Sequence, residues 1–387
     1  MELLFYSHAF APQVGGVETF SMHLACGLAL RSHGGGATPA HVTVVTQTAE
    51  VRELDTPQAP FQIIRRPGAR RLWQLIGSAD KVVLAGPAIL PLIFALIRRK
   101  PVIVTHHGYQ SICPNGLLFY VPTQSPCSGH FAARRYLECV RCNAPQEKLA
   151  GSVRNLLLTF FRRGLCWFAD SNVAVSDHVA RRIALPHAQV IRNGVPVMPP
   201  MKGISETSQT GICFAYVGRL VTEKGVGTLL DAACLLKARQ CRFRILIIGD
   251  GPEREPLQRM ASSASLDDVV SFAGFLTGSR LQEMLTEVSV VVVPSIWEEP
   301  APLSPLEQMM QNRLVIGSNI GGLAEQIGDA GLRFEVGNSA ALADQMQRVI
   351  KDPLSITQFG YRSRERALKL YSLDRMLQEY RILIQGV

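Results

Sequence analysis

The 387-residue chain is poor in charged residues (18%) and aromatic residues (7%), whereas 47% of its residues are hydrophobic. This composition excludes a disordered or collagen-like chain, and the length excludes a disulfide-stapled small domain. At roughly 100–200 residues per domain, we expect two globular domains. The most apolar run, residues 82–97, is shorter than the ~18–20 residues that span a bilayer, and it contains two prolines. It predicts a buried strand followed by a helix.

The amino terminus also lacks the features of an export signal. It has no basic n-region, and residues 3–7 are typical of a first strand. Nine cysteines, an odd number spread over a long chain, indicate a reducing compartment. We therefore expect a cytoplasmic protein.

Charge is distributed unevenly along the chain. Residues 1–200 hold 20 basic and 10 acidic side chains, a net charge of +10, whereas residues 201–387 hold 20 and 21, a net charge of −1. A basic excess in one half indicates either a solvated face or a surface for phosphate-rich partners such as anionic lipids, lipid-linked phosphates or nucleic acid. Nucleic acid is the weaker interpretation, because no recognised nucleic-acid-binding module is present.

Short β-rich runs alternate with amphipathic stretches throughout, which predicts βαβ units with parallel sheets. The expected strands are residues 3–7, 42–46, 62–64, 81–84, 102–105, 172–175 and 189–191, then 212–217, 244–248, 269–272, 290–293, 314–316 and 332–334. Each set suffices for a doubly wound sheet. The fold class is therefore α/β, with two Rossmann-like domains facing a central cleft, where ligands bind in such folds.

A linker between the two sets is indicated by three prolines and two glycines within residues 194–203. We expect an N-terminal domain over 1–197 with an irregular, cysteine-containing insertion over 108–146. A linker over 198–210 and a C-terminal domain over 211–365 follow. Residues 366–387 form a last helix, which either finishes the second domain or crosses back to the first.

Two motifs of the first half follow expected strands. Gly15 and Gly16 precede a helical stretch, where glycines let the backbone approach a ligand and the helix N-terminus favours an anion; a tight turn explains them equally well. His106 and His107 follow strand 102–105, so one of them could face the cleft and hydrogen-bond a sugar hydroxyl or shuttle a proton. A solvated loop histidine is the plainer interpretation.

The second half offers two cations and two acids. Arg219 comes directly after a strand and Lys224 precedes the next helix, so together they could clamp a diphosphate. Glu299 lies on a loop, and Glu307 lies in the first turn of a helix expected to begin near Pro305; both carboxylates could accept hydrogen bonds from vicinal hydroxyls. The alternatives are exposed basic residues and solvated acids at a helix start.

Four cysteines lie in the expected insertion: Cys113, Cys127, Cys139 and Cys142. The last two form a Cys-x-x-Cys pair, so four thiolates could hold a structural zinc ion, although the first two are not a close pair. Free or redox-active thiols remain the alternative.

Taken together, the chain resembles the GT-B retaining glycosyltransferases of family 4 along essentially its whole length. The matching segments are Gly15-Gly16-Val17-Glu18, Thr105-His106-His107-Gly108, Asn193-Gly194-Val195, Gly218-Arg219-Leu220 with Glu223-Lys224-Gly225, Glu299 and Glu307 with seven residues between them, and Gly321-Gly322-Leu323-Ala324-Glu325.

The resemblance implies roles for four residues of the second half. Arg219 and Lys224 are similar to the pair that neutralises the donor diphosphate. Glu307 looks like the ribose ligand, and Glu299 is similar to the acid that contacts the transferred sugar.

The resemblance also implies roles in the first half. Gly16, next to Gly15, would bring backbone close to the phosphates, and His107 would touch the sugar near the reacting carbon. The tail helix would cross back onto the first domain. The cysteine insertion resembles that of a subset of the family.

The chain departs from the family pattern at two places. Ala301-Pro302 stands where Phe-Gly is common, and proline donates no N–H. Any backbone donor to phosphate would then come from Leu303 or Ser304. Gly108 stands where Asp often follows the histidine.

We therefore expect transfer of a sugar, with retention, from a UDP- or GDP-linked donor to a hydroxyl group, in cell-envelope polysaccharide or glycolipid synthesis. No Asp-x-Asp occurs in the chain, so no cofactor is expected for catalysis. The alternatives are a non-catalytic nucleotide-sugar-binding protein and an epimerase or phosphorylase with the same two domains. A nicotinamide-dependent dehydrogenase is disfavoured, because Gly249-Asp250-Gly251 lacks the third glycine of a dinucleotide fingerprint.

The expected acceptor is lipid-linked or a saccharide. Basic pairs beside apolar stretches in the first half indicate peripheral contact with an anionic membrane, at its inner face. These basic residues are Arg98-Arg99-Lys100, Arg134-Arg135, Arg162-Arg163 and Arg181-Arg182.

Overall fold

The computed structural model describes residues 1–30, 40–49, 59–143, 148–200 and 211–386. The chain divides into two compact units. The N-terminal unit comprises Met1–Pro122, Cys127–Gly194 and Leu373–Val387, and the C-terminal unit comprises Thr123–Pro126 and Val195–Ser372. Most of the expected linker, residues 201–210, lies outside the described part.

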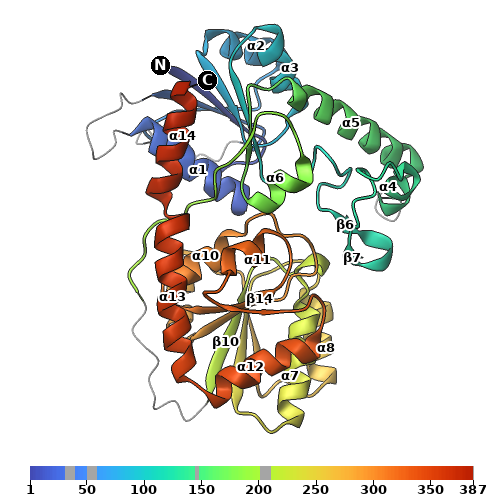
Figure 1. Cartoon of the computed structure of the whole chain (residues 1–387), viewed down its shortest axis with the longest axis vertical. Coiled ribbons are helices and arrows are strands. Elements are labelled where there is room, and N and C mark those ends of the chain that lie inside the picture. The colour runs from blue at the N-terminus through green and yellow to red at the C-terminus, as the bar shows by residue number, and fades with distance from the viewer. Residues whose placement is uncertain (31–39, 50–58, 144–147, 201–210, 387) are drawn as a thin grey trace. The chain divides into compact units, whose positions relative to one another are not determined.

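The N-terminal unit is built on a parallel sheet of seven strands in the order β3-β2-β1-β4-β5-β8-β9 (Figure 1). These strands are β1 (Glu2–Ser7), β2 (His41–Thr46), β3 (Gln62–Arg65), β4 (Lys81–Leu84), β5 (Val102–His106), β8 (Ser171–Ala174) and β9 (Ala188–Val190). The helices are α1 (Gly16–Ala29), α2 (Ala69–Ser78), α3 (Ile89–Ile97), α4 (Tyr136–Asn143), α5 (Leu149–Trp167), α6 (Asp177–Ile183) and α14 (Leu373–Gly386). The strand order reverses between β1 and β4, as in a doubly wound sheet.

The C-terminal unit is built on a parallel sheet of six strands in the order β12-β11-β10-β13-β14-β15. These strands are β10 (Ile212–Val217), β11 (Phe243–Ile248), β12 (Val270–Gly274), β13 (Val290–Val293), β14 (Leu314–Ser318) and β15 (Leu332–Phe334). The helices are α7 (Val226–Ala238), α8 (Arg254–Ser263), α9 (Gly278–Met284), α10 (Leu303–Met310), α11 (Gly321–Ile327), α12 (Ser339–Lys351) and α13 (Leu354–Tyr371), with the 3-10 turns η2 (Thr222–Lys224) and η3 (Leu285–Glu287). All thirteen predicted strands are present, and their ends agree with the predicted ones to within two residues.

Alternation along the strands gives the C-terminal sheet an apolar core on each face. Phe214 and Tyr216 of β10 join one cluster, whereas Cys213 and Ala215 join the other. A strand buried on both faces needs apolar residues at successive positions, which explains why these runs are recognisable in the sequence. The apolar run over 82–97 forms β4 and α3, and no helix in the described part of the chain is long and apolar enough to cross a membrane.

The insertion is less irregular than expected. It contains the short strands β6 (Phe119–Tyr120) and β7 (Ser125–Pro126), which pair with each other, and the 3-10 turn η1 (Val121–Thr123). It also contains α4, which packs against α5.

The helical tail breaks at Ser372, six residues after the expected boundary at 366. Ser372 has an extended backbone and pairs with Val195, whose N–H donates to the carbonyl of Tyr371 at 2.9 Å. α13 therefore finishes the C-terminal unit, and α14 packs beside α1 in the N-terminal unit (Figure 1). There the hydroxyls of Tyr380 and Thr105 hydrogen-bond at 3.0 Å. The other boundary differs in the opposite direction, because the N-terminal unit ends at Gly194, before the expected linker start at 198.

We predict that Gly360→Ala destabilises the C-terminal unit. A Cβ at Gly360 of α13 would lie 2.1 Å from the backbone oxygen of Asn312, which cannot move without shifting the chain. We expect the free energy of unfolding to fall by about 1–3 kcal/mol, despite the better helix propensity of alanine. Gly164→Ala in α5 is the control, since nothing lies within 4 Å of its Cβ. Urea denaturation should separate the two variants, and equal midpoints would contradict this packing.

Candidate functional site

The loop after β10 carries both predicted cations, and its backbone is held by contacts with neighbouring residues. The hydroxyl of Tyr216 donates to the carbonyl of Arg219 at 2.6 Å, and the side chain of Arg219 is exposed. Gly225 follows with φ of +64°, and a Cβ there would lie 2.2 Å from the carbonyl oxygen of Pro294. Only glycine therefore lets this loop close against the loop that follows β13.

The two loops are joined at Lys224 and Glu299. The N–H of Ile296 donates to the carbonyl of Glu223 at 2.9 Å, which brings the loops side by side. Lys224 Nζ then lies 2.5 Å from Glu299 Oε1, and the side chain of Glu299 is only 3% exposed. The structure thus assembles the predicted cation and the predicted acid, with their side chains bound to each other.

Glu299 has further partners that the sequence did not reveal. The hydroxyl of Ser295 donates to Glu299 Oε1 at 2.6 Å, and Lys224 Nζ lies 5.4 Å from the ring centroid of Trp297. The N–H of Gly322, in the segment after β14, donates to the Glu299 carbonyl at 2.6 Å. Ser295 lies four residues before Glu299, but a serine in a loop gives no signal of its own in a single sequence.

α10 begins earlier than predicted. Its first residue is Leu303 rather than a position near Pro305, so Glu307 lies in the second turn. Pro302 precedes the helix, and the Ser304 hydroxyl donates to the carbonyl of Val217 at 3.1 Å, which fixes this helix start at the end of β10. The N–H groups of a first helical turn have no acceptor within the helix, so Leu303 and Ser304 can offer theirs to an anion.

Of the two predicted acids, Glu307 has the less stabilised carboxylate. Burial raises the pKa of its carboxyl group to about 7. The described residues offer this carboxyl group no recorded hydrogen bond or ion pair. The group therefore changes its protonation near neutral pH.

In the N-terminal unit, the glycines and histidines lie around α1. α1 begins at Gly16. A Cβ atom added at Gly16 would have no neighbouring atom within 4 Å, whereas one added at Gly15 would meet the side chain of Glu18. Gly15 has an extended backbone with φ of −176°, which other residues also adopt. The ring of His107 packs against Phe20 of α1, with centroids 4.2 Å apart.

The two histidines differ in surroundings. His106 is fully buried and its Nε2 lies 2.9 Å from Asn172 Oδ1, so it is the core histidine of the pair. His107 is the more exposed one, and its Nε2 has no partner within the described residues. Burial lowers the pKa of His106 to about 4 and that of His107 to about 3. Both rings are therefore neutral at pH 7 and add no positive charge.

The four cysteines of the insertion are all buried, and every pair of their thiols is close enough to interact electrostatically. Burial raises the pKa of Cys139 to about 12 and that of Cys113 to about 11. Cys113 Sγ donates to Asn115 Oδ1 at 2.9 Å, and Cys142 Sγ donates to the carbonyl of Phe119 at 3.3 Å. In the described ranges, no three His, Cys, Asp or Glu side chains are arranged to hold a metal ion.

The zinc site stays a prediction that metal analysis can test. If four thiolates hold zinc, the purified protein should contain one zinc ion per chain, because four ligands complete one tetrahedral site. Cys139→Ser should then lose the metal, whereas Cys166→Ser, a buried cysteine on α5, should keep it. A zinc content near zero in the unmodified chain would refute the site.

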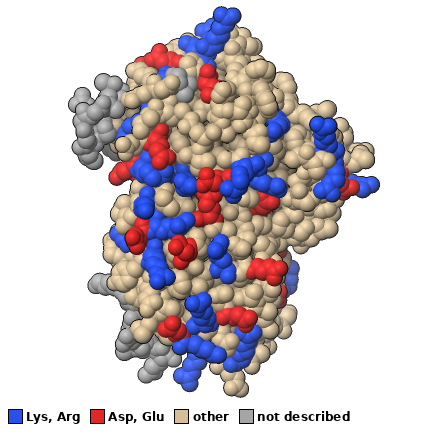
Figure 2. All heavy atoms as spheres, in the orientation of Figure 1, with Lys and Arg blue, Asp and Glu red and all other residues tan. Residues whose placement is uncertain are grey.

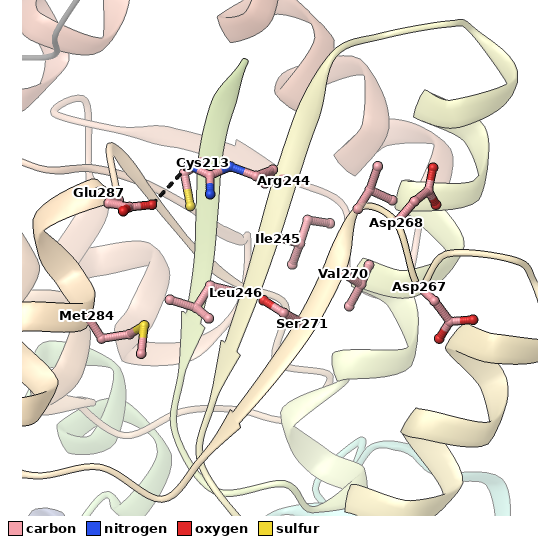
Figure 3. Close-up of a pocket in the computed structure, with 11 residues that line it drawn as sticks. Cys213, Arg244, Ile245, Leu246, Asp267, Asp268, Val270, Ser271, Met284 and Glu287 are labelled. Atoms are coloured by element: carbon pink, nitrogen blue, oxygen red, sulfur yellow. Dashed lines mark hydrogen bonds and ion pairs between the residues drawn. The ribbon is translucent and has the colours of Figure 1, made fainter. Parts of the chain in front are cut away.

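A hollow of about 230 Å³ lies elsewhere on the C-terminal sheet (Figure 3). It is lined from the beginnings of β10 and β11, and there Arg244 forms an ion pair with Glu287 at 3.0 Å. Arg219 and Glu299 follow the carboxyl ends of β10 and β13 instead, so this hollow is not part of the candidate site. Ligands of parallel α/β sheets bind at the carboxyl ends.

Residues 200–366, nearly the whole C-terminal unit, match the family model described as "Glycosyl transferases group 1". The C-terminal unit is similar to the group 1 glycosyl transferases. This family segment contains the loops that carry Arg219, Lys224, Glu299 and Glu307.

Relatives and solved structures extend the likeness. The chain is 31% identical to a 2-deoxystreptamine glucosyltransferase of Streptomyces kanamyceticus over 148 residues, 38% of either chain. It is 27% identical to an alpha-maltose-1-phosphate synthase of Mycobacterium tuberculosis over 87% of this chain and 92% of that one. The matches to the five relatives of higher similarity span 35–47% of the relatives' own length.

The fold of the whole chain is shared with HepE of Anabaena, solved in complex with UDP. The TM-score is 0.74 at 17% identity, and the likeness covers 100% of both chains. The predicted fold class, two Rossmann-like domains of the GT-B type, is confirmed at this level. The predicted cleft concerns the relative position of the units and stays a prediction.

We predict that Glu307 makes the C-terminal unit less stable as the pH rises. Its pKa of about 7 lies above the usual 4.5, so the folded chain binds the proton more tightly than the unfolded chain. The stability that this proton contributes is complete below pH 4.5 and is lost as pH rises through about 7. Glu307→Gln should therefore stabilise the protein at pH 8, by about 3 kcal/mol at most, and have little effect at pH 4.5.

Chemical denaturation at both pH values measures this difference. Glu255→Gln, on the surface of α8, is the control and should show no such pH dependence. An equal effect of Glu307→Gln at the two pH values would contradict the raised pKa.

Proposed function

We propose that the protein transfers a glycosyl unit from a nucleoside diphosphate sugar to a hydroxyl group. The observation that carries this proposal is the convergence of the loops after β10 and β13 with the start of α10. Arg219, Lys224 and the N–H groups of Leu303 and Ser304 are presented by these segments. Two cations and a helix N-terminus suit a diphosphate, the leaving group of such a reaction.

The donor assignment also draws on the structural neighbours. HepE of Anabaena was solved with UDP and with UDP-glucose, which makes a UDP-linked sugar the first donor to test, followed by a GDP-linked one. In this proposal Glu307 accepts hydrogen bonds from the ribose and Glu299 from the transferred sugar. In the N-terminal unit, the backbone at Gly15 and Gly16 would approach the phosphates of the donor. Neutral His107 would contact the sugar.

In the proposed reaction, negative charge develops on the diphosphate as the glycosyl bond breaks. Arg219 and Lys224 would stabilise that charge, and the ammonium of Lys224 would do so from a position that is already fixed. Lys224 is oriented by Glu299 and Trp297 before any donor arrives. We propose retention of anomeric configuration, which the coupling constant of the product's anomeric proton would establish or refute.

The acceptor in this proposal is a lipid-linked or saccharide hydroxyl of the cell envelope. The motivating observation is the net charge of +10 in residues 1–200, which suits a phosphate-bearing acceptor. The competing proposal is a non-catalytic protein that binds a nucleotide sugar and has lost turnover through Pro302. Pro302 precedes the first residue of α10, so it interrupts no helical hydrogen bond, but it offers no N–H to a phosphate. Donor hydrolysis or transfer activity would exclude this alternative.

We predict that removing the two cations abolishes transfer. Arg219→Ala and Lys224→Ala should each lower turnover about 10²–10³-fold, and the double variant should lower it further. Release of nucleoside diphosphate from donor and acceptor measures the rate. Arg244→Ala, a cation at the other end of the same sheet, is the matched control and should keep normal turnover.

Thermal unfolding of each variant verifies folding, because Lys224→Ala leaves the Glu299 carboxylate with the Ser295 hydroxyl as its recorded partner. A folded double variant that turns over within tenfold of the unmodified enzyme would overturn the proposed function.

A further inference from the structure

α5 exposes an apolar stripe on the surface of the N-terminal unit. Six large side chains recur along the helix and expose 41–70% of their surface: Leu149, Val153, Leu157, Phe161, Trp167 and Phe168, the last directly after the helix. The helical period places them on one side, beside the side on which Ser152, Leu156, Thr159 and Cys166 are buried. Contiguous exposed apolar surface of this kind marks an interaction site.

The stripe continues onto the neighbouring helices, which pack against α5 (Figure 1). Phe160 contacts the rings of Phe131 and Tyr136, with centroid distances of 4.8 and 5.0 Å, and on α4 the neighbouring Leu137 is exposed. On the other flank, α3 ends at the exposed Ile97.

The last residues of α3 and α5 lie at the same edge of the N-terminal sheet. The N–H of Val102, at the start of β5, donates to Asp170 Oδ2 at 2.8 Å. The exposed residues Ile97, Trp167 and Phe168 thus lie at the ends of two helices that pack against each other and end at the same side of the sheet.

The charges around the stripe are almost all positive. Residues 148–168 contain four basic side chains and no acidic one. Arg154 is exposed beside the stripe, and Arg98 and Arg99 are exposed next to Ile97. Figure 2 shows Lys and Arg side chains predominating over Asp and Glu where α4 and α5 lie. Glu138, the acid of α4, is already paired with Arg141.

We propose that the stripe on α5 docks on an anionic lipid bilayer. Leucine, phenylalanine and tryptophan side chains would enter the interfacial region while flanking arginines contact lipid phosphates, the division of labour of interfacial helices. A second copy is a poor occupant, since a symmetric pairing through α5 would bring two Arg154 side chains and their neighbours together without any acidic partner. The positive rim favours an anionic surface over a neutral one.

Vesicle co-sedimentation of the full chain tests this proposal, using phosphatidylcholine with and without phosphatidylglycerol. We expect binding to the anionic vesicles that weakens with added salt, and little binding to the neutral ones. The double variant L157D/F161D should bind at least tenfold more weakly, because two apolar groups that enter the interface become charged. Phe275→Asp is the matched control, since Phe275 is an exposed aromatic residue of the C-terminal unit.

Arg154→Gln should weaken binding to anionic vesicles and leave the weak binding to neutral vesicles unchanged. Circular dichroism establishes that every variant is folded. Undiminished binding by L157D/F161D, equal binding to both kinds of vesicle, or no binding at low salt would overturn the proposal. So would light scattering that shows a dimer of the unmodified chain and a monomer of L157D/F161D, because the stripe would then be an interface between copies.

Discussion

The buried carboxylate of Glu299 is the constraint that organises the carboxyl edge of the C-terminal sheet. A charge removed from water must be paired and hydrogen-bonded, and Glu299 has the ammonium of Lys224 and the hydroxyl of Ser295. Lys224 reaches it because Gly225 lets two loops close, and Gly322 fixes the Glu299 backbone from a third. Glu299 therefore joins the loops after β10 and β13 through its carboxylate and the segment after β14 through its backbone carbonyl, and the cation proposed for the donor has a fixed position.

This pairing also limits the charge available to a ligand. Arg219 and Lys224 supply two positive charges, of which Glu299 balances one, so a diphosphate would depend on the exposed Arg219 and on the N-terminus of α10. Glu307 lies one turn further along α10, where a second ionised carboxylate would oppose the ligand. Its pKa of about 7 keeps a substantial fraction protonated near neutral pH, which reduces that opposition. Burial of Glu307 would thus lower the negative charge that the proposed diphosphate meets.

The sequence predicts the thirteen strands because strands buried on both faces must be apolar at successive positions, a pattern that local reading detects. It does not predict the break at Ser372, because the break depends on pairing with Val195, far away in the chain. The start of α10 at Leu303 was missed for a similar reason, since Ser304 is anchored by the carbonyl of Val217. Charge and position in the sequence predict Lys224 and Glu299 as site residues, and the structure pairs their side chains. The contacts of Ser295 with Glu299 and of Trp297 with Lys224 arise only on folding, so the sequence does not reveal them.

The basic excess of the chain has a cause other than the donor. Arg219 and Lys224 lie in the half with a net charge of −1, and the +10 half places neutral histidines at its own predicted site. Some of its arginines serve the fold, as when Arg163 donates to the carbonyl of Ile183. Others, such as Arg154, are exposed beside apolar side chains that a soluble domain alone does not require. Positive charge next to apolar surface suits an anionic lipid surface better than a nucleotide, so in our proposal this half would bring the protein to the surface where its acceptor lies.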